Sequence, residues 1–118
     1  MLQLKFYSVL MKGVILVIKV YVGSNRIRVQ GHANAAPKGQ DIVCAAVSAL
    51  TLTLIRGLKD IACMTIYEEV EPGNVCIKWQ KANDTGKVLI DTWFLGMCAI
   101  VETCKEVDIY DDGIGRYI

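Results

Sequence analysis

Cys44 and His32 are the two residues of this chain whose types and spacing suggest chemistry. His32 is the sole histidine, and it precedes Cys44 by twelve positions. A thiolate attacks carbonyl carbon atoms, and an imidazole can take the thiol proton and return it to a leaving amine. The pair therefore predicts nucleophilic acyl transfer.

Asp41 is predicted to cap a helix that spans residues 42–56, because its carboxylate can accept a hydrogen bond from a first-turn amide. Cys44 would then be the third helical residue. Unpaired amides and the positive end of the helix dipole lower the pKa of a thiol there, and they can hold an oxyanion. Asp41 can also orient His32. Its negative charge, however, opposes the effect of the helix dipole on the Cys44 thiol. Ser48 lies one turn after Cys44, where it can bond near the thiol or to its own helix.

Structural interpretations of the same residues stay open. A cysteine among alanines is commonly a small buried hydrophobe. His32 can equally be a satisfied surface or core histidine, and Asp41 only a cap. The remaining cysteines lie inside apolar runs and are predicted to be core residues, namely Cys63, Cys76, Cys98 and Cys104.

The elements around this pair follow from hydrophobic periodicity. Apolar and alternating runs predict strands at 14–22, 26–31, 62–70 and 75–80, with a turn of Glu71-Pro72-Gly73-Asn74 between the last two. Small residues predict a loop at 33–39, and Gly57 is expected to end the helix that follows. A second helix is predicted at 87–105, with a short edge strand after 107.

This order predicts an α+β fold, ββαββα, with helices packed on a mainly antiparallel sheet. The 87–105 helix is apolar on two stripes, so it needs the sheet and a second surface, which a symmetric partner chain can supply. We expect one domain over residues 1–118. With Met11 as a candidate alternative start, we expect residues 1–10 to be an optional extension.

The composition of the chain argues against several classes of protein. Hydrophobic residues make up 53% of the 118 residues, which argues against disorder. The net charge of +1 argues against nucleic-acid binding by charge alone, and Lys78, Lys81 and Lys87 are expected on a solvated loop face.

Five cysteines without a CxxC pair predict no disulfide framework, no metal site and no cofactor. The apolar run 13–18 is too short to span a membrane. Free thiols suit the cytoplasm.

A longer motif connects these residues. Gly31-His32-Ala33 is followed, after five residues, by Gly39 and then by Asp-Ile-Val-Cys-Ala-Ala-Val-Ser at 41–48. This block resembles the signature of the ribosomal-processing cysteine protease family, Prp, including the interval from histidine to cysteine. The rest of the chain resembles the family in element order, so the resemblance covers about residues 12–106.

The resemblance implies a homodimeric bacterial cysteine peptidase that removes a short N-terminal extension from a large-subunit ribosomal protein, with capsid proteins of phages as further substrates. It makes His32 and Cys44 the catalytic pair. It also implies a loop that closes over the peptide substrate, with Gly31, Ala33, Asn34, Pro37 and Gly39 as its candidate residues. The family often has glycine and aromatic residues where this chain has 34–37, so the cleavage preference is left open.

Two other functions fit the same residues. A non-catalytic dimeric module that binds a ribosome or capsid would keep the fold without needing a reactive thiol. A thiol–disulfide redox protein fits less well, because Cys44 has no nearby resolving cysteine in the sequence.

Overall fold

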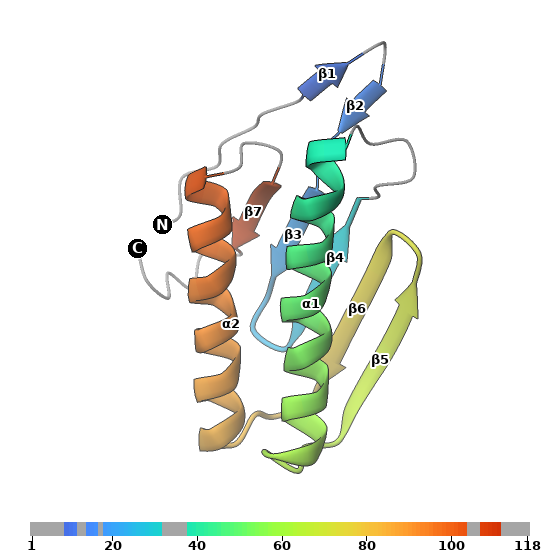
Figure 1. Ribbon diagram of the computed structural model, residues 1–118. Coiled ribbons are helices and arrows are strands. Elements are labelled where there is room, and N and C mark those ends of the chain that lie inside the picture. Colours follow the sequence, from blue (N-terminus) through green and yellow to red (C-terminus); the bar gives the residue numbers. More distant parts are fainter. Residues whose placement is uncertain (1–8, 12–13, 17, 32–37, 104–106, 112–118) are drawn as a thin grey trace.

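The computed structural model describes residues 9–11, 14–16, 18–31, 38–103 and 107–111 (Figure 1). These residues form two helices and seven strands. In chain order they are β1 (Val9–Met11), β2 (Val14–Leu16), β3 (Ile18–Val22), β4 (Arg26–Gln30), α1 (Lys38–Asp60), β5 (Ile66–Glu71), β6 (Asn74–Trp79), α2 (Asp84–Thr103) and β7 (Val107–Asp111).

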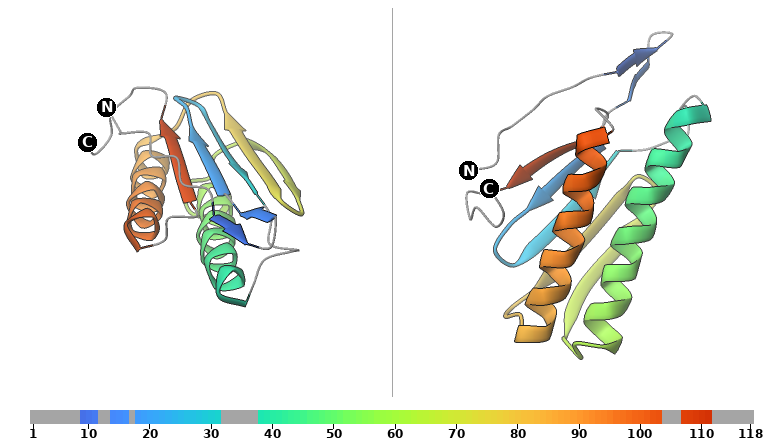
Figure 2. Two further views of the ribbon diagram at one scale, coloured as in Figure 1. Left: turned by 90° about the horizontal axis from the view of Figure 1, so that it is seen from above. Right: turned by 60° about the vertical axis from the view of Figure 1, so that its left-hand side comes forward.

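Five strands form the main sheet, in the order β5-β6-β4-β3-β7. All neighbours are antiparallel except β3 and β7, which run parallel. Both helices cover one face of this sheet, and no helix of the described part of the chain lies on the other (Figure 2). The predicted α+β architecture with a mainly antiparallel sheet is therefore confirmed, and the short edge strand after 107 is β7.

The hairpin β3–β4 forms as the alternating pattern predicts. Inward residues of β3 and β4 are buried, and Gly23 N donates to Arg26 O across the turn at 2.8 Å. The predicted strand 14–22 is divided, however. Its first part, β2, pairs with β1 in a separate two-stranded sheet. This hairpin projects beyond the end of the main sheet at which α1 begins (Figure 1).

Helix α1 continues through Gly57 to Asp60, so the predicted stop at Gly57 is wrong. A Cβ atom at Gly57 would lie 3.3 Å from Cδ1 of Leu89, so the glycine allows α2 to pack closely there. The chain leaves the helix at Cys63, whose φ is 54°. Met64 N then donates to Leu58 O at 2.8 Å. Strand β5 consequently begins at Ile66 rather than at 62.

Helix α2 begins at Asp84, three residues earlier than predicted, because Asn83 caps it. The Asn83 Oδ1 atom accepts a hydrogen bond from Gly86 N at 2.7 Å. The second packing surface of α2 is α1 of the same chain. Trp93 Nε1 donates to the buried Thr51 Oγ1 at 3.2 Å, so the two helices are joined without a partner chain.

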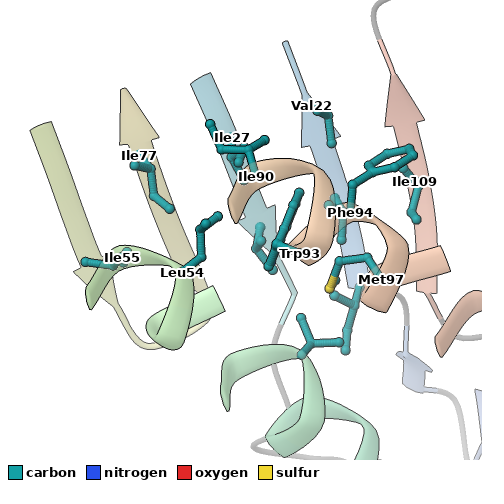
Figure 3. Packing of buried hydrophobic residues seen from close by; sticks show 14 of the residues in the cluster. Val22, Ile27, Leu54, Ile55, Ile77, Ile90, Trp93, Phe94, Met97 and Ile109 are labelled. Carbon is teal, nitrogen blue, oxygen red and sulfur yellow. The ribbon is translucent and has the colours of Figure 1, made fainter. Parts of the chain in front are cut away.

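The core lies between the helix layer and the sheet (Figure 3). Phe94 and Met97 of α2 are fully buried against Val20 and Ile27 of the sheet, with Leu58 from α1. By length and composition alone, Ile42–Asp60 is apolar enough to cross a membrane. About 33% of that window is buried inside the structure. Its inward residues pack into the core, whereas Ile42, Leu50 and Leu52 are exposed.

Candidate active site

Cys44 lies on α1, but not where the sequence predicts. The helix begins at Lys38, so Asp41 lies inside its first turns and is not its cap. Gly39, expected in the substrate loop, is helical as well. Cys44 is thus the seventh helical residue, beyond the four unpaired amides at the helix start. Cys44 therefore does not lie in the first turn, where the sequence predicts it, and the oxyanion site at those amides stays a prediction.

A groove of about 460 Å³ nevertheless runs past Cys44. The Cys44 side chain is half-buried and packs against the edge of the core. One wall of the groove comes from α1, where Cys44, Ser48 and Leu52 follow one another at intervals of one helical turn. The predicted common face of Cys44 and Ser48 is therefore observed.

The opposite wall is the β5–β6 turn together with the end of β4. Pro72 and Gly73 line it, and so does Gly31. Gly31 N donates to Gly73 O at 3.1 Å, and both glycines have positive φ angles of 136° and 78°. This bond fixes the end of β4 against the turn. The turn itself is predictable from its Pro-Gly pair, but its place beside Cys44 depends on the pairing of β4 with β6.

The groove is mostly apolar. Val29, Val70 and Val75 contribute its floor and sides, and Glu71 is the one charged residue among the described residues that line it. An apolar channel of this kind takes apolar side chains of a ligand, while a single carboxylate on its wall favours a nearby cation.

Several predicted site residues lie outside the described part of the chain. They are His32, Ala33, Asn34 and Pro37. Gly31, the residue directly before His32, is described and lines the groove. The Asp41 backbone is helical, and its side chain is not among those described.

The other cysteines are less buried than predicted. Cys63 is exposed, because the chain turns outward at the end of α1, and it is not a core residue. Cys76 and Cys98 are half-buried, and Cys104 lies outside the described residues. Within the described ranges no three His, Cys, Asp or Glu side chains gather as metal ligands.

Comparison with known families shows the class of this protein. The sequence profile described as cysteine protease Prp matches residues 8–107, most of the chain. The chain belongs to the cysteine protease Prp family. It is thus a cysteine peptidase, and the resemblance carried by the Cys44 motif is confirmed. A comparison with curated protein sequences gives no significant match.

Solved structures share the fold of this Prp family member. The essential ribosomal processing protease Prp from S. aureus, with a covalently linked product peptide, superposes with a TM-score of 0.70 at 18% identity, over 82% of this chain and 99% of that one. The same S. aureus protease with a substrate peptide gives 0.67, also at 18% identity and with the same coverage. SMU.848 from Streptococcus mutans gives 0.65 at 23% identity, over 82% and 95%.

Proposed function

We propose that this peptidase removes a short N-terminal extension from a large-subunit ribosomal protein, with Cys44 as nucleophile and His32 as base. The observation that carries the proposal is the position of Cys44 in an apolar groove whose far wall ends at Gly31. The S. aureus neighbour, a ribosomal processing protease seen with substrate and product peptides, supports the choice of substrate.

Covalent geometry tethers the proposed base to this groove. Consecutive Cα atoms are about 3.8 Å apart, so His32 cannot leave the neighbourhood of Gly31. The hydrogen bond from Gly31 to Gly73 holds that anchor in place. Asp41 precedes Cys44 by three residues on α1, and we propose that it orients the imidazole ring. Ser48 is proposed as a polar contact for the peptide backbone.

The reaction proceeds through a thioester. His32 takes the proton of Cys44, and the sulfur attacks the scissile carbonyl carbon. The C–N bond breaks as the imidazolium donates its proton to the leaving amine. Water, deprotonated by His32, then attacks the thioester carbonyl, and the released thiol regains its proton. No cofactor is required. The segment 33–37, the part of the predicted 33–39 loop that precedes α1, is proposed to close over the peptide and exclude water.

The groove suggests how the peptide is held. An extended segment lies between α1 and the β5–β6 turn, with apolar side chains against Leu52, Val70 and Val75. Glu71 favours a lysine or arginine at one neighbouring position of the peptide. We also propose that the protein is a homodimer and that it is located in the cytoplasm. Analytical ultracentrifugation of the purified chain tests whether it forms a dimer.

Cleavage of synthetic peptides tests the activity directly. Peptides that match N-terminal extensions of ribosomal proteins, and peptides from phage capsid proteins, are incubated with the enzyme and analysed by mass spectrometry. Cleavage of a ribosomal peptide at one bond is the expected result. Cleavage of capsid peptides alone would reassign the substrate. Stoichiometric binding without cleavage would instead indicate a non-catalytic module.

A further inference from the structure

The sheet face opposite the helices carries a second hollow, of about 510 Å³. It spans β3, β4 and β6 and reaches Tyr110 on β7. Three cationic side chains line it, those of Arg26, Arg28 and Lys78. No carboxylate is among its described lining residues. The carboxylates that the described residues place on this face of the sheet belong to the flanking strands β5 and β7.

The three cations are neighbours through strand pairing. Arg26 and Lys78 are directly opposed on β4 and β6, and Arg28 follows Arg26 on the same face. Like charges directly opposed in a sheet are destabilising, so this arrangement favours a bound anion between them. The Arg28 Nε atom donates to Asn74 Oδ1 at 3.2 Å, and Lys78 Nζ lies 5.9 Å from the centroid of the Tyr67 ring. Both contacts hold the cationic groups on this face.

An aromatic pair lies beside the cations. Tyr21 and Tyr110 stack with ring centroids 5.1 Å apart and an interplanar angle of 17°. Tyr21 is the register partner of Arg28 on one side and of Tyr110 on the other. Both tyrosine side chains are half-buried. Along one register line across the sheet, the two tyrosine rings are thus followed directly by the guanidinium group of Arg28.

We propose that this hollow binds single-stranded nucleic acid, with phosphates on Arg26, Arg28 and Lys78 and a base against the Tyr21–Tyr110 pair. Cations that track a backbone beside aromatic stacking surfaces are how open sheets bind single strands. The Cys44 groove is lined by Val29 and Val75 from the helix-covered face of the same sheet. Nucleic acid and peptide therefore occupy opposite sides of the sheet and bind independently.

The proposal revises an expectation from composition. A net charge of +1 argues against nucleic-acid binding only if the charges are evenly spread. Strand pairing gathers three of the cations into one hollow. An acidic polypeptide would match the charge as well, but it would make no use of the stacked tyrosines.

Fluorescence anisotropy with a labelled twelve-nucleotide oligouridine tests the site. Three phosphate contacts predict a slope of about −2 for log affinity against log salt. In the variant Arg26→Gln/Arg28→Gln/Lys78→Gln we expect binding to fall to background. The control Arg56→Gln/Lys81→Gln/Lys87→Gln changes the net charge equally, at exposed positions outside the hollow, and should bind like the parent protein. Tyr110→Leu should weaken binding about fivefold or more through lost stacking.

Four outcomes would overturn the proposal. They are absence of binding by the parent protein at low salt, equal loss in both triple variants, equal competition by a polyglutamate peptide, and a shift in oligomeric state confined to the sheet variant. Peptide cleavage should be unchanged in both triple variants. Their activity thus separates a failure of this site from a failure of the Cys44 assignment.

Discussion

The amide of Gly31 donates a hydrogen bond to the carbonyl oxygen of Gly73, and it joins two segments that lie far apart in the sequence. Gly31 directly precedes the proposed base, and Gly73 forms the tip of the β5–β6 turn. Both residues also line the groove of Cys44. The contact therefore connects the wall of the groove to the tether of His32, and it makes the turn part of the proposed site.

Substitution of Gly73 tests this coupling. Its φ of 78° is left-handed, which costs an alanine roughly 1–2 kcal/mol. We expect Gly73→Ala to lower the thermal midpoint and to reduce kcat/KM by about tenfold to a hundredfold, because the His32 tether shifts. Gly73→Asn is the control, since asparagine tolerates this conformation. An alanine variant that is less stable but fully active would show that the turn does not position the base.

Loss of the Cys44 sulfur should abolish cleavage. We expect Cys44→Ala to reduce peptide cleavage by about 10⁴-fold or more, and to change the free energy of unfolding by about 1 kcal/mol or less. Cys63→Ala removes an exposed thiol outside the groove and should keep full activity. Mass spectrometry of the products and urea unfolding measure both effects. Cleavage at the parent rate by Cys44→Ala would exclude this residue as nucleophile.

Alkylation separates a catalytic thiol from an inert one. Cys63 is exposed and Cys44 only half-buried, so exposure alone predicts that iodoacetamide modifies Cys63 first. Activation by His32 predicts the reverse at pH 7, because the thiolate is the reacting form. We expect His32→Gln to slow labelling of Cys44 and leave Cys63 unchanged. Peptide mapping gives both rates. Slower labelling of Cys44 than of Cys63 in the parent protein would favour a binding module.

The contact between the two helices can be measured through a pair of threonines. Thr51 and Thr53 both donate to the carbonyl four residues earlier on α1, but only Thr51 is buried and accepts from Trp93. Thr51→Val leaves the indole N–H unsatisfied and should cost about 1–3 kcal/mol. Thr53→Val, at the exposed position, should stay within about 0.5 kcal/mol. Equal urea midpoints for the two variants would show that the Trp93 bond contributes nothing.

Because of Tyr110, we expect the stability of the fold to depend on pH in the alkaline range. Desolvation, the charge of Asp108 and the neighbouring Tyr21 raise the pKa of Tyr110 above 10.0. The folded chain thus keeps this proton longer than the unfolded chain, so stability is complete below pH 10 and falls as the pH rises through the folded-state value. In an absorbance titration at 295 nm, Tyr110→Phe should remove a component that titrates above pH 10. An unchanged titration curve would contradict this.

Local pattern predicted much of the fold. The alternating residues of 26–30 show which face of the strand is buried, because periodicity reflects burial directly. Val43, Val47, Leu54 and Leu58 of α1 likewise lie on one helical stripe and are buried, although the nearby Leu50 is exposed. The turn between β5 and β6 can also be predicted from the sequence, because its Pro-Gly pair favours the backbone angles of a turn. The boundaries were less accurate. Gly57 suggests a helix stop in the sequence, whereas in the structure the missing side chain makes room for Leu89.

By itself, the sequence determined the chemical candidates and the family, since the Cys44 motif is a run of adjacent residues. Only the tertiary structure decided what surrounds them. It placed Cys44 in the seventh position of α1, set Gly73 across from it, and brought Arg26 and Lys78 into register on the opposite face. The physical reason is that strand pairing and helix packing join residues distant along the chain, and no local periodicity records which strands will pair.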